Sequence, residues 1–419
     1  MSSTRYSICD RRSRGNAVQD VWVGIDAGKT HHHAVAIDHE GRTLLSRRVV
    51  NGQPELTDLI DDVVTLAAGG PITWAVDLNS GGAALLIALL RVGGQSLLYI
   101  PGRIVHHAAA GYRGDGKTDA KDAAIIADQA RMRRDLLPMR ADDEISVELA
   151  LLTSHRTDLM RDRTRTINRL RALLSTYFPA LERALDLSNV KGALILLTGF
   201  QTPEGIRSLG APALEAWLRN RKAYNATELA RRATEAALSQ VVRVAGQCVT
   251  AAVVETLAHS VLDLNRRLAE LDKQIEETFR RHRSATVIES MPGMGPLLGA
   301  EFLAATGGDV TAFGTADRLA AVAGLAPAPR DSGRVSGNLR RPRRYDRRLL
   351  RVAYLSAQLS VRSCPASKVF YDRKRAEGKR HTQAVLALAR RRSNVLWAML
   401  RDGTTYDDRS GAPPHAEAA

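Results

Sequence analysis

The segment VWVGIDAGKTHHHAVAIDHEGRTLLSRRVV, residues 21–50, decides the fold. Its first part, Val21–Asp26, is apolar and ends on a carboxylate, which predicts a buried strand. His31–Asp38 and Arg42–Val50 flank His39-Glu40-Gly41, and this pattern favours a hairpin between two strands. We therefore expect three consecutive strands that pair as a meander.

Strands and helices alternate after the meander. The predicted elements are helix Pro54–Ala68, strand Ile72–Asp77, helix Ala83–Val92, strand Ser96–Ile100 and helix Asp119–Arg134. A meander followed by this alternation favours an α/β layer fold of the ribonuclease H type. We assign that fold, as a metal-binding catalytic domain, to residues 18–141.

The remainder of the chain is predicted to be mostly helical. Residues 142–285 form a helical, coiled-coil region, and residues 286–406 form a mostly α-helical C-terminal domain. Met291-Pro-Gly-Met-Gly-Pro296 is predicted to break the helical pattern. The two ends, residues 1–17 and 407–419, are expected to be disordered tails.

One predicted helix carries a heptad seam. Its apolar positions step alternately by four and three residues: Leu257, Val261, Leu264, Leu268, Leu271, Ile275 and Thr278. Two interpretations remain open, a coiled coil with another helix or subunit and a helix packed inside its own domain.

Charge is concentrated near the C-terminus. The chain has 60 Lys and Arg against 45 Asp and Glu, a net charge of +15. Between Arg340 and Arg401 there are 18 basic residues and three acids, so this segment accounts for the whole excess. A localised basic field favours a polyanionic partner, here DNA and RNA, over a merely basic soluble protein. The candidate contacts are Arg330, Arg334, Arg340, Arg341, Arg343, Arg344, Arg390, Arg391 and Arg392.

The cysteines and the hydropathy of the chain indicate the cellular compartment in which the protein is expected. Cys9, Cys248 and Cys364 are far apart and have no zinc-ligand spacing, which fits a reducing bacterial cytoplasm. No apolar run is long enough to span a membrane, and no signal peptide begins the chain. We expect a cytoplasmic protein that associates with the nucleoid when active.

Four acids form the candidate metal site. Asp26 and Asp77 end predicted strands, and Asp119 and Asp122 share one face at the start of a predicted helix. Four converging carboxylates repel one another unless a divalent cation such as Mg²⁺ (or Mn²⁺) lies between them. Such a cation neutralises and positions a scissile phosphate. The alternatives are a turn residue for Asp26 and helix N-terminal charge for Asp119 and Asp122.

The glycines after Asp26 allow a competing interpretation. A phosphate loop needs glycine five residues before Gly28-Lys29, and that position is Val23, so the pattern fails. The segment also looks like the first phosphate turn of sugar kinases and actin-like ATPases, but that class does not explain the basic C-terminal third. His31, His32 and His33 alternate faces on a strand, so they cannot all bind one metal.

Ser332 is the candidate nucleophile. It follows a proline-rich stretch and precedes Gly333, where backbone can approach a phosphate closely. Arg330 and Arg334 flank it and could offset the charge of an anionic transition state. The alternative is an ordinary Ser-Gly turn.

Several motifs, in this order and spacing, resemble transposases of the insertion-sequence-110 family. They are Val-Gly-Ile-Asp26, Gly-Lys-Thr-Asp119-Ala-Lys-Asp122-Ala, Met-Pro-Gly-Met-Gly-Pro296, Ala-Gly-Leu-Ala-Pro327, Asp-Ser332-Gly and Ala-Glu-Gly-Lys379. The resemblance covers roughly residues 21–406.

The resemblance implies an N-terminal domain like the Holliday-junction resolvases, with an acidic metal tetrad. By matching position, Asp26, Asp119 and Asp122 fall on tetrad acids; the family usually has glutamate at the second position, where this chain has Asp77. Ser332 falls on a serine nucleophile. The resemblance also implies a structured noncoding guide RNA that pairs with donor and target DNA.

We therefore predict a DNA transposase that excises and inserts an insertion sequence and that acts as a homo-oligomer, since strand exchange needs several active sites. Two other classes stay open at this point. One is an actin-like or sugar-kinase-like ATPase on the same core fold, and the other is a non-catalytic nucleic-acid-binding protein.

Overall fold

The computed structural model describes residues 18–78, 81–100, 102–112, 116, 118–134, 136, 139, 144–329, 331–333, 336–340 and 342–407. The predicted N-terminal tail, most of the C-terminal tail, and Arg330, Arg334 and Arg341 lie outside these residues. The chain divides into two compact units, Met1–Ala141 and Asp142–Ala419.

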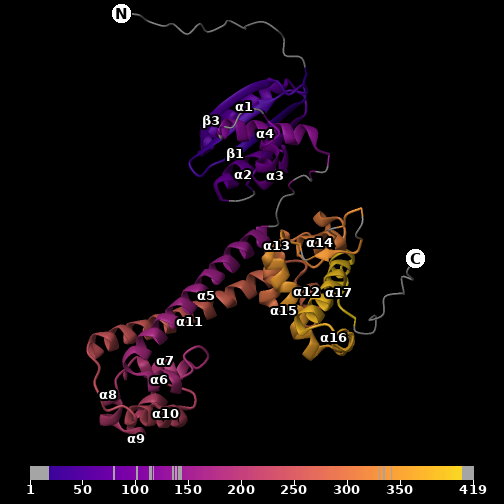
Figure 1. Cartoon of the computed structure of the whole chain (residues 1–419). Coiled ribbons are helices and arrows are strands. Elements are labelled where there is room, and N and C mark those ends of the chain that lie inside the picture. Colours follow the sequence, from indigo (N-terminus) through magenta and orange to yellow (C-terminus); the bar gives the residue numbers. More distant parts are fainter. Residues whose placement is uncertain are drawn as a thin grey trace, which may run out of the picture. The chain divides into compact units, whose positions relative to one another are not determined.

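The first unit is a mixed α/β domain (Figure 1). Its elements are β1 (Val21–Ala27), β2 (His31–Ile37), β3 (Thr43–Val50), α1 (Gln53–Ala67), β4 (Ile72–Val76), the 3-10 turn η1 (Gly81–Ala83), α2 (Ala84–Val92), β5 (Ser96–Tyr99), α3 (Gly102–Ala109) and α4 (Asp119–Met132). The predicted meander and the alternation after it are confirmed. Helix α3 was not predicted.

One five-stranded sheet organises this unit, in the order β3-β2-β1-β4-β5. β1 pairs antiparallel with β2 and parallel with β4, so the central strand joins the meander to the parallel half. Apolar side chains of α1 and α2 pack on one face, around Val23, Ile25 and Trp74. Helices α3 and α4 cover the other face, where Ala123 and Ala127 of α4 contact β2.

The second unit is almost entirely helical. Its elements are α5 (Glu144–Tyr177), α6 (Pro179–Ala184), α7 (Lys191–Leu197), α8 (Pro203–Leu209), α9 (Ala211–Asn220), α10 (Ala226–Leu238), α11 (Gln247–Arg280), α12 (Ala285–Ser290), α13 (Pro296–Thr306), η2 (Val310–Phe313), α14 (Ala316–Val322), the two-residue strands β6 (Ala328–Pro329) and β7 (Leu339–Arg340), α15 (Arg347–Ser363), α16 (Pro365–Ala376) and α17 (His381–Asp402). Among the described helices, none has the length and apolar character needed to cross a membrane.

Two long helices, α5 and α11, run side by side through this unit (Figure 1). The end of α5 and the start of α11 share a core with α6–α10. The start of α5 and the end of α11 share a second core with α12–α17, so the pair is antiparallel. The predicted heptad seam lies on α11, and its positions are buried or half-buried in these two cores. Packing within its own unit therefore accounts for the seam.

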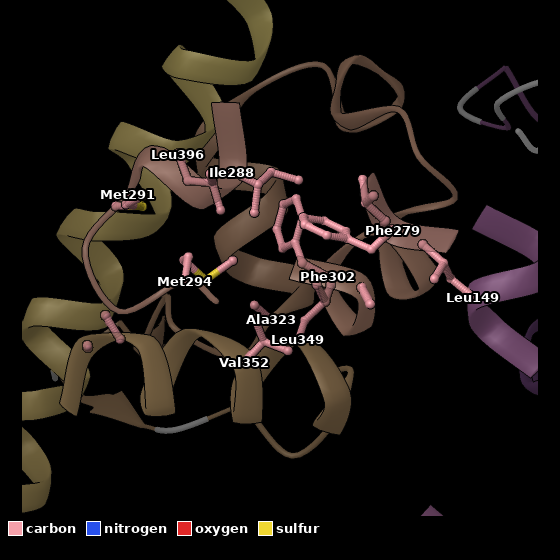
Figure 2. Close-up of a cluster of buried hydrophobic side chains, with 14 of the residues drawn as sticks. Leu149, Phe279, Ile288, Met291, Met294, Phe302, Ala323, Leu349, Val352 and Leu396 are labelled. Carbon is pink, nitrogen blue, oxygen red and sulfur yellow. The ribbon is translucent and has the colours of Figure 1, made fainter. Parts of the chain in front are cut away.

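The second core is built from aromatic and aliphatic side chains of segments distant in sequence (Figure 2). Leu149 of α5 and Phe279 of α11 join Phe302, Leu349 and Leu396 of the C-terminal helices there. Because these side chains form one continuous core, the start of α5, the end of α11 and the C-terminal helices fold as one body.

The Met291–Pro296 motif separates two helices of this core. Gly293 has φ +80°, and a Cβ there would lie 2.7 Å from the Ser356 carbonyl oxygen. Glycine is required both by the left-handed backbone and by the close approach of α15. The predicted helix break is confirmed, because α12 ends at Ser290 and α13 begins at Pro296.

Candidate active site and nucleic-acid interface

Asp26 and Asp77 lie at the same edge of the sheet. β1 and β4 are parallel with Ile25 opposite Val76, so the next residues, Asp26 and Asp77, are level with each other. The backbone N–H of Ala27 donates a hydrogen bond to Oδ1 of Asp77 at 3.1 Å. This bond fixes the Asp77 carboxylate against the end of the central strand.

Helix α4 brings the other two acids to this edge. A Cβ on Gly24 would lie 2.1 Å from the Ala123 carbonyl oxygen and 2.3 Å from the Ala127 nitrogen, so α4 rests directly on the β1 backbone. Asp26 shares the face of β1 that carries Gly24. Asp122 immediately precedes Ala123, and the Thr118 hydroxyl caps the helix by accepting from the Lys121 N–H.

Electrostatics show that two of these acids interact. Burial raises the pKa of Asp77, and the negative charge of Asp122 raises it further, against hydrogen bonds from the backbone that lower it. Asp26 and Asp122 are half-buried, whereas Asp119 is exposed in the first turn of α4. The structure therefore brings Asp26, Asp77 and Asp122 to one corner of the domain, with Asp119 at the adjoining helix end.

The side chains of this corner do not form a closed metal cage. Within the described part of the chain, no group of three or more His, Cys, Asp or Glu side chains is arranged to hold a metal ion. The donor chemistry itself suits a hard divalent cation, because these groups are carboxylates that repel one another.

His33 was missed as a candidate site residue. It is the cross-strand partner of Asp26, so both side chains lie on the sheet face that α4 covers. Its Nε2 lies 3.0 Å from the Ser46 hydroxyl. The alternation predicted for the three histidines is confirmed: the His32 side chain is buried on the opposite face from His33, and burial lowers its pKa. The register of the predicted hairpin was the signal that could have identified His33.

Ser332 belongs to the second unit, in the connection between β6 and β7. These strands pair antiparallel, with Ala328 opposite Arg340. The loop is closed by a hydrogen bond from the Asn338 N–H to Oδ1 of Asp331 at 2.9 Å. Ser332 is exposed, so its hydroxyl is accessible at the surface of this unit.

The predicted basic contacts differ in accessibility. Arg340, Arg343 and Arg344 are exposed. Arg390 is half-buried and forms an ion pair with Asp317 at 2.6 Å.

The two other predicted contacts on α17, Arg391 and Arg392, have different surroundings. Arg391 lies over the ring of Phe370, 5.2 Å from its centroid. Arg392 is buried, with 6% of its surface exposed, and it donates to the Pro292 carbonyl and, at 2.9 Å, to the Ser356 hydroxyl. The sequence placed Arg392 on the exposed basic surface because of its charge, but the side chain lies in the interior.

Comparison with known proteins identifies the family. A family model described as a transposase matches residues 23–179, and a model of the transposase IS116/IS110/IS902 family matches residues 285–372. The chain is 62% identical over 388 residues to the insertion element IS900 uncharacterized 42 kDa protein of Mycobacterium paratuberculosis, covering 93% of this chain and 97% of that protein. It is 38% identical to the insertion element IS110 43.6 kDa protein of Streptomyces coelicolor, covering 94% and 96%. The chain belongs to the IS110 family of transposases.

Membership of this family decides between the functional classes left open by the sequence. Transposases cleave and rejoin DNA, so the IS110-family transposase described here is an enzyme that acts on DNA. It is neither an actin-like ATPase nor a non-catalytic binding protein. The first matched segment of the transposase contains the four acids, and the second contains Ser332.

Proposed function

We propose that this transposase excises and inserts an insertion sequence by using a carboxylate metal site together with a serine nucleophile. The proposal is supported by two observations: Asp26 and Asp77 end neighbouring parallel strands, and the charge of Asp122, in the first turn of α4, raises the pKa of Asp77. The sheet order β3-β2-β1-β4-β5 supports a ribonuclease H-like domain, in which a meander joins a parallel half at the central strand.

Asp26, Asp77, Asp119 and Asp122 would hold Mg²⁺ or Mn²⁺. A bound divalent cation supplies charge neutralisation at the scissile phosphate and positions the reacting oxygens. The raised pKa of Asp77 supports this role, because a carboxylate that is destabilised by burial and by Asp122 gains most from a cation.

Ser332 would attack the DNA backbone. Its Oγ bonds to phosphorus while the bond from phosphorus to the departing DNA oxygen breaks; the serine gives its proton to a base and the departing oxygen takes one up. The phosphoserine link conserves the bond energy, and a DNA hydroxyl reverses the step to rejoin the strands. Exposure of Ser332 beside Gly333 supports access by a phosphate.

A structured noncoding RNA from the element would guide this reaction, and several copies of the chain would act together. The basic C-terminal segment supports nucleic-acid binding, and the Arg-rich surface of α5, which includes Arg161 and Arg165, supports contact with an RNA helix through its phosphates. Purification from a host that carries the whole element should recover one defined RNA; recovery of heterogeneous cellular RNA only would contradict guidance.

The acid site is tested by strand transfer in Mg²⁺ with end-labelled element DNA and its RNA. Asp26→Asn and Asp122→Asn should abolish strand transfer, because each removes a ligand oxygen's charge with little change in volume. Asp58→Asn is the matched control, since Asp58 is an exposed acid on α1 of the same unit. Full activity of Asp26→Asn would show that these acids do not form the metal site.

A further inference from the structure

A cavity of about 450 Å³ lies in the second unit between α16, α17 and the segment that follows α17. Met291, Leu388 and Met399 contribute apolar surface to it. The Tyr406 N–H donates to the Ser290 hydroxyl at 2.9 Å, which holds this last segment in place as one wall. The cavity is large enough for a small organic ligand.

Arg392 contributes a buried positive charge to this cavity. It is 6% exposed, its Nε has no hydrogen-bond partner, and among the described residues no carboxylate pairs with it. Burial lowers the pKa of Arg392 to about 10, so the guanidinium stays charged at neutral pH. A buried cation without a counter-charge is costly, and an anion entering the cavity would offset that cost.

The remaining polar groups of the cavity also suit a nucleotide. Arg391 adds a second cation at the same wall, beside the ring of Phe370. Asn394 and Thr404 offer amide and hydroxyl groups that can hydrogen-bond a base edge. Two acids also line the cavity: Asp402 is paired with Arg401 at 2.6 Å, and Asp407 lies in the segment that follows α17.

We propose that this cavity binds one unpaired DNA nucleotide, with its phosphate on Arg392 and Arg391 and its base against the apolar wall. Arginine recognises phosphate through paired, charge-assisted hydrogen bonds, and bases taken out of a duplex are held in pockets with apolar or aromatic walls. Strand exchange separates DNA strands, so the family's reaction produces such nucleotides. The proposal does not depend on the acid site or on Ser332.

A matched pair of substitutions tests the cavity in the full-length protein. Val395 lines it and is 36% exposed, so Val395→Trp would occupy the cavity from its mouth. Val369→Trp is the control, because Val369 is 70% exposed on α16 and is not among the lining residues. The probes are a fluorescein-labelled DNA single strand, the same strand in a continuous duplex, and an RNA strand of the same sequence, followed by fluorescence anisotropy.

Val395→Trp should bind the DNA single strand about tenfold more weakly than Val369→Trp, the loss expected when one stacked base is excluded. Binding of the continuous duplex should be unchanged, and circular dichroism should show the same fold for both variants. If Val395→Trp does not fold, Ala398→Leu fills the same cavity with a smaller change. Equal single-strand affinity for filled and control variants, an equal loss for duplex, or a loss for the RNA strand alone would each overturn the proposal.

Discussion

Replacing Gly24 by alanine should separate α4 from the sheet and disable the acid site. The new Cβ would lie 2.1 Å from the Ala123 carbonyl oxygen, although side-chain carbons do not approach other atoms closer than 3.0 Å. This oxygen and the Ala127 nitrogen, 2.3 Å from the new Cβ, both belong to the backbone of α4, so no side-chain rotation can relieve the clash. Helix α4 must therefore withdraw by about 1 Å, which loosens Ala123 and Ala127 from the core.

The size of the effect follows from this geometry. Over-packing a core costs about 1–3 kcal/mol, and a clash with rigid backbone belongs at the upper end of that range. A loss of about 3 kcal/mol should lower the melting temperature of the first unit by roughly 10 °C. Gly102→Ala is the control, because a Cβ on Gly102 meets nothing within 4 Å and the residue begins a helix of the same unit.

Differential scanning calorimetry measures the melting temperature, and hydrogen exchange of β1 and α4 peptides locates the change. Strand transfer should be lost in Gly24→Ala at a temperature where the variant is still folded, because Asp122 moves with α4 away from Asp77. A Gly24→Ala protein that melts like Gly102→Ala and keeps its activity would refute the proposed packing of α4 and the site that depends on it.

Further predictions concern charge and metal. Without metal, Asp77→Asn should raise the melting temperature at pH 7.5. The pKa of Asp77 is higher in the folded protein than in the unfolded chain, so the ionised carboxylate destabilises the fold. The gain should therefore vanish as the pH falls below the ordinary pKa of aspartate, where the carboxyl group is protonated in both states. Mg²⁺ should raise the melting temperature of the unaltered protein more than that of Asp77→Asn, measured by the same scan. Asp77→Glu should keep strand transfer, since the resemblance to the family allows the longer acid. The logarithm of DNA affinity should fall linearly with the logarithm of salt concentration, and Arg343→Gln should reduce that slope by about 1 if Arg343 contacts one phosphate. Arg392→Gln should weaken binding of a DNA single strand and should also lower the melting temperature, because its guanidinium donates to the Pro292 carbonyl and the Ser356 hydroxyl in the interior.

Local patterns predicted the sheet and its acids. The apolar run that ends on Asp26 and the short strand before Asp77 form as expected, because burial of alternating side chains is encoded within each segment. Parallel pairing then requires their ends to meet. The sequence did not predict α3, β6 or β7. Helix α3 is short and begins at a glycine, and β6 and β7 have two residues each, so none of the three gives a clear periodic signal.

The sequence could not predict which charges face solvent. The count of basic residues grouped Arg390, Arg391 and Arg392 as one exposed cluster. Successive residues of a helix point in different directions, however, and Arg392 lies on the buried face of α17. Leu388 and Leu396, four residues before and after Arg392, lie on the buried face and were the available signal. The close approach of α4 at Gly24 depends on contacts between distant segments, which no local pattern contains.

The most direct test of the proposed chemistry is to trap the protein–DNA bond. End-labelled element DNA, its RNA and Mg²⁺ are incubated with the transposase, and the products are separated on a denaturing gel. Ser332→Ala is compared with Ser336→Ala, which alters another exposed serine of the same connection. We predict a labelled adduct with the unaltered protein and with Ser336→Ala, and none with Ser332→Ala, which should still bind nucleic acid. Normal recombination by Ser332→Ala, or strand cleavage without any adduct, would contradict the serine mechanism.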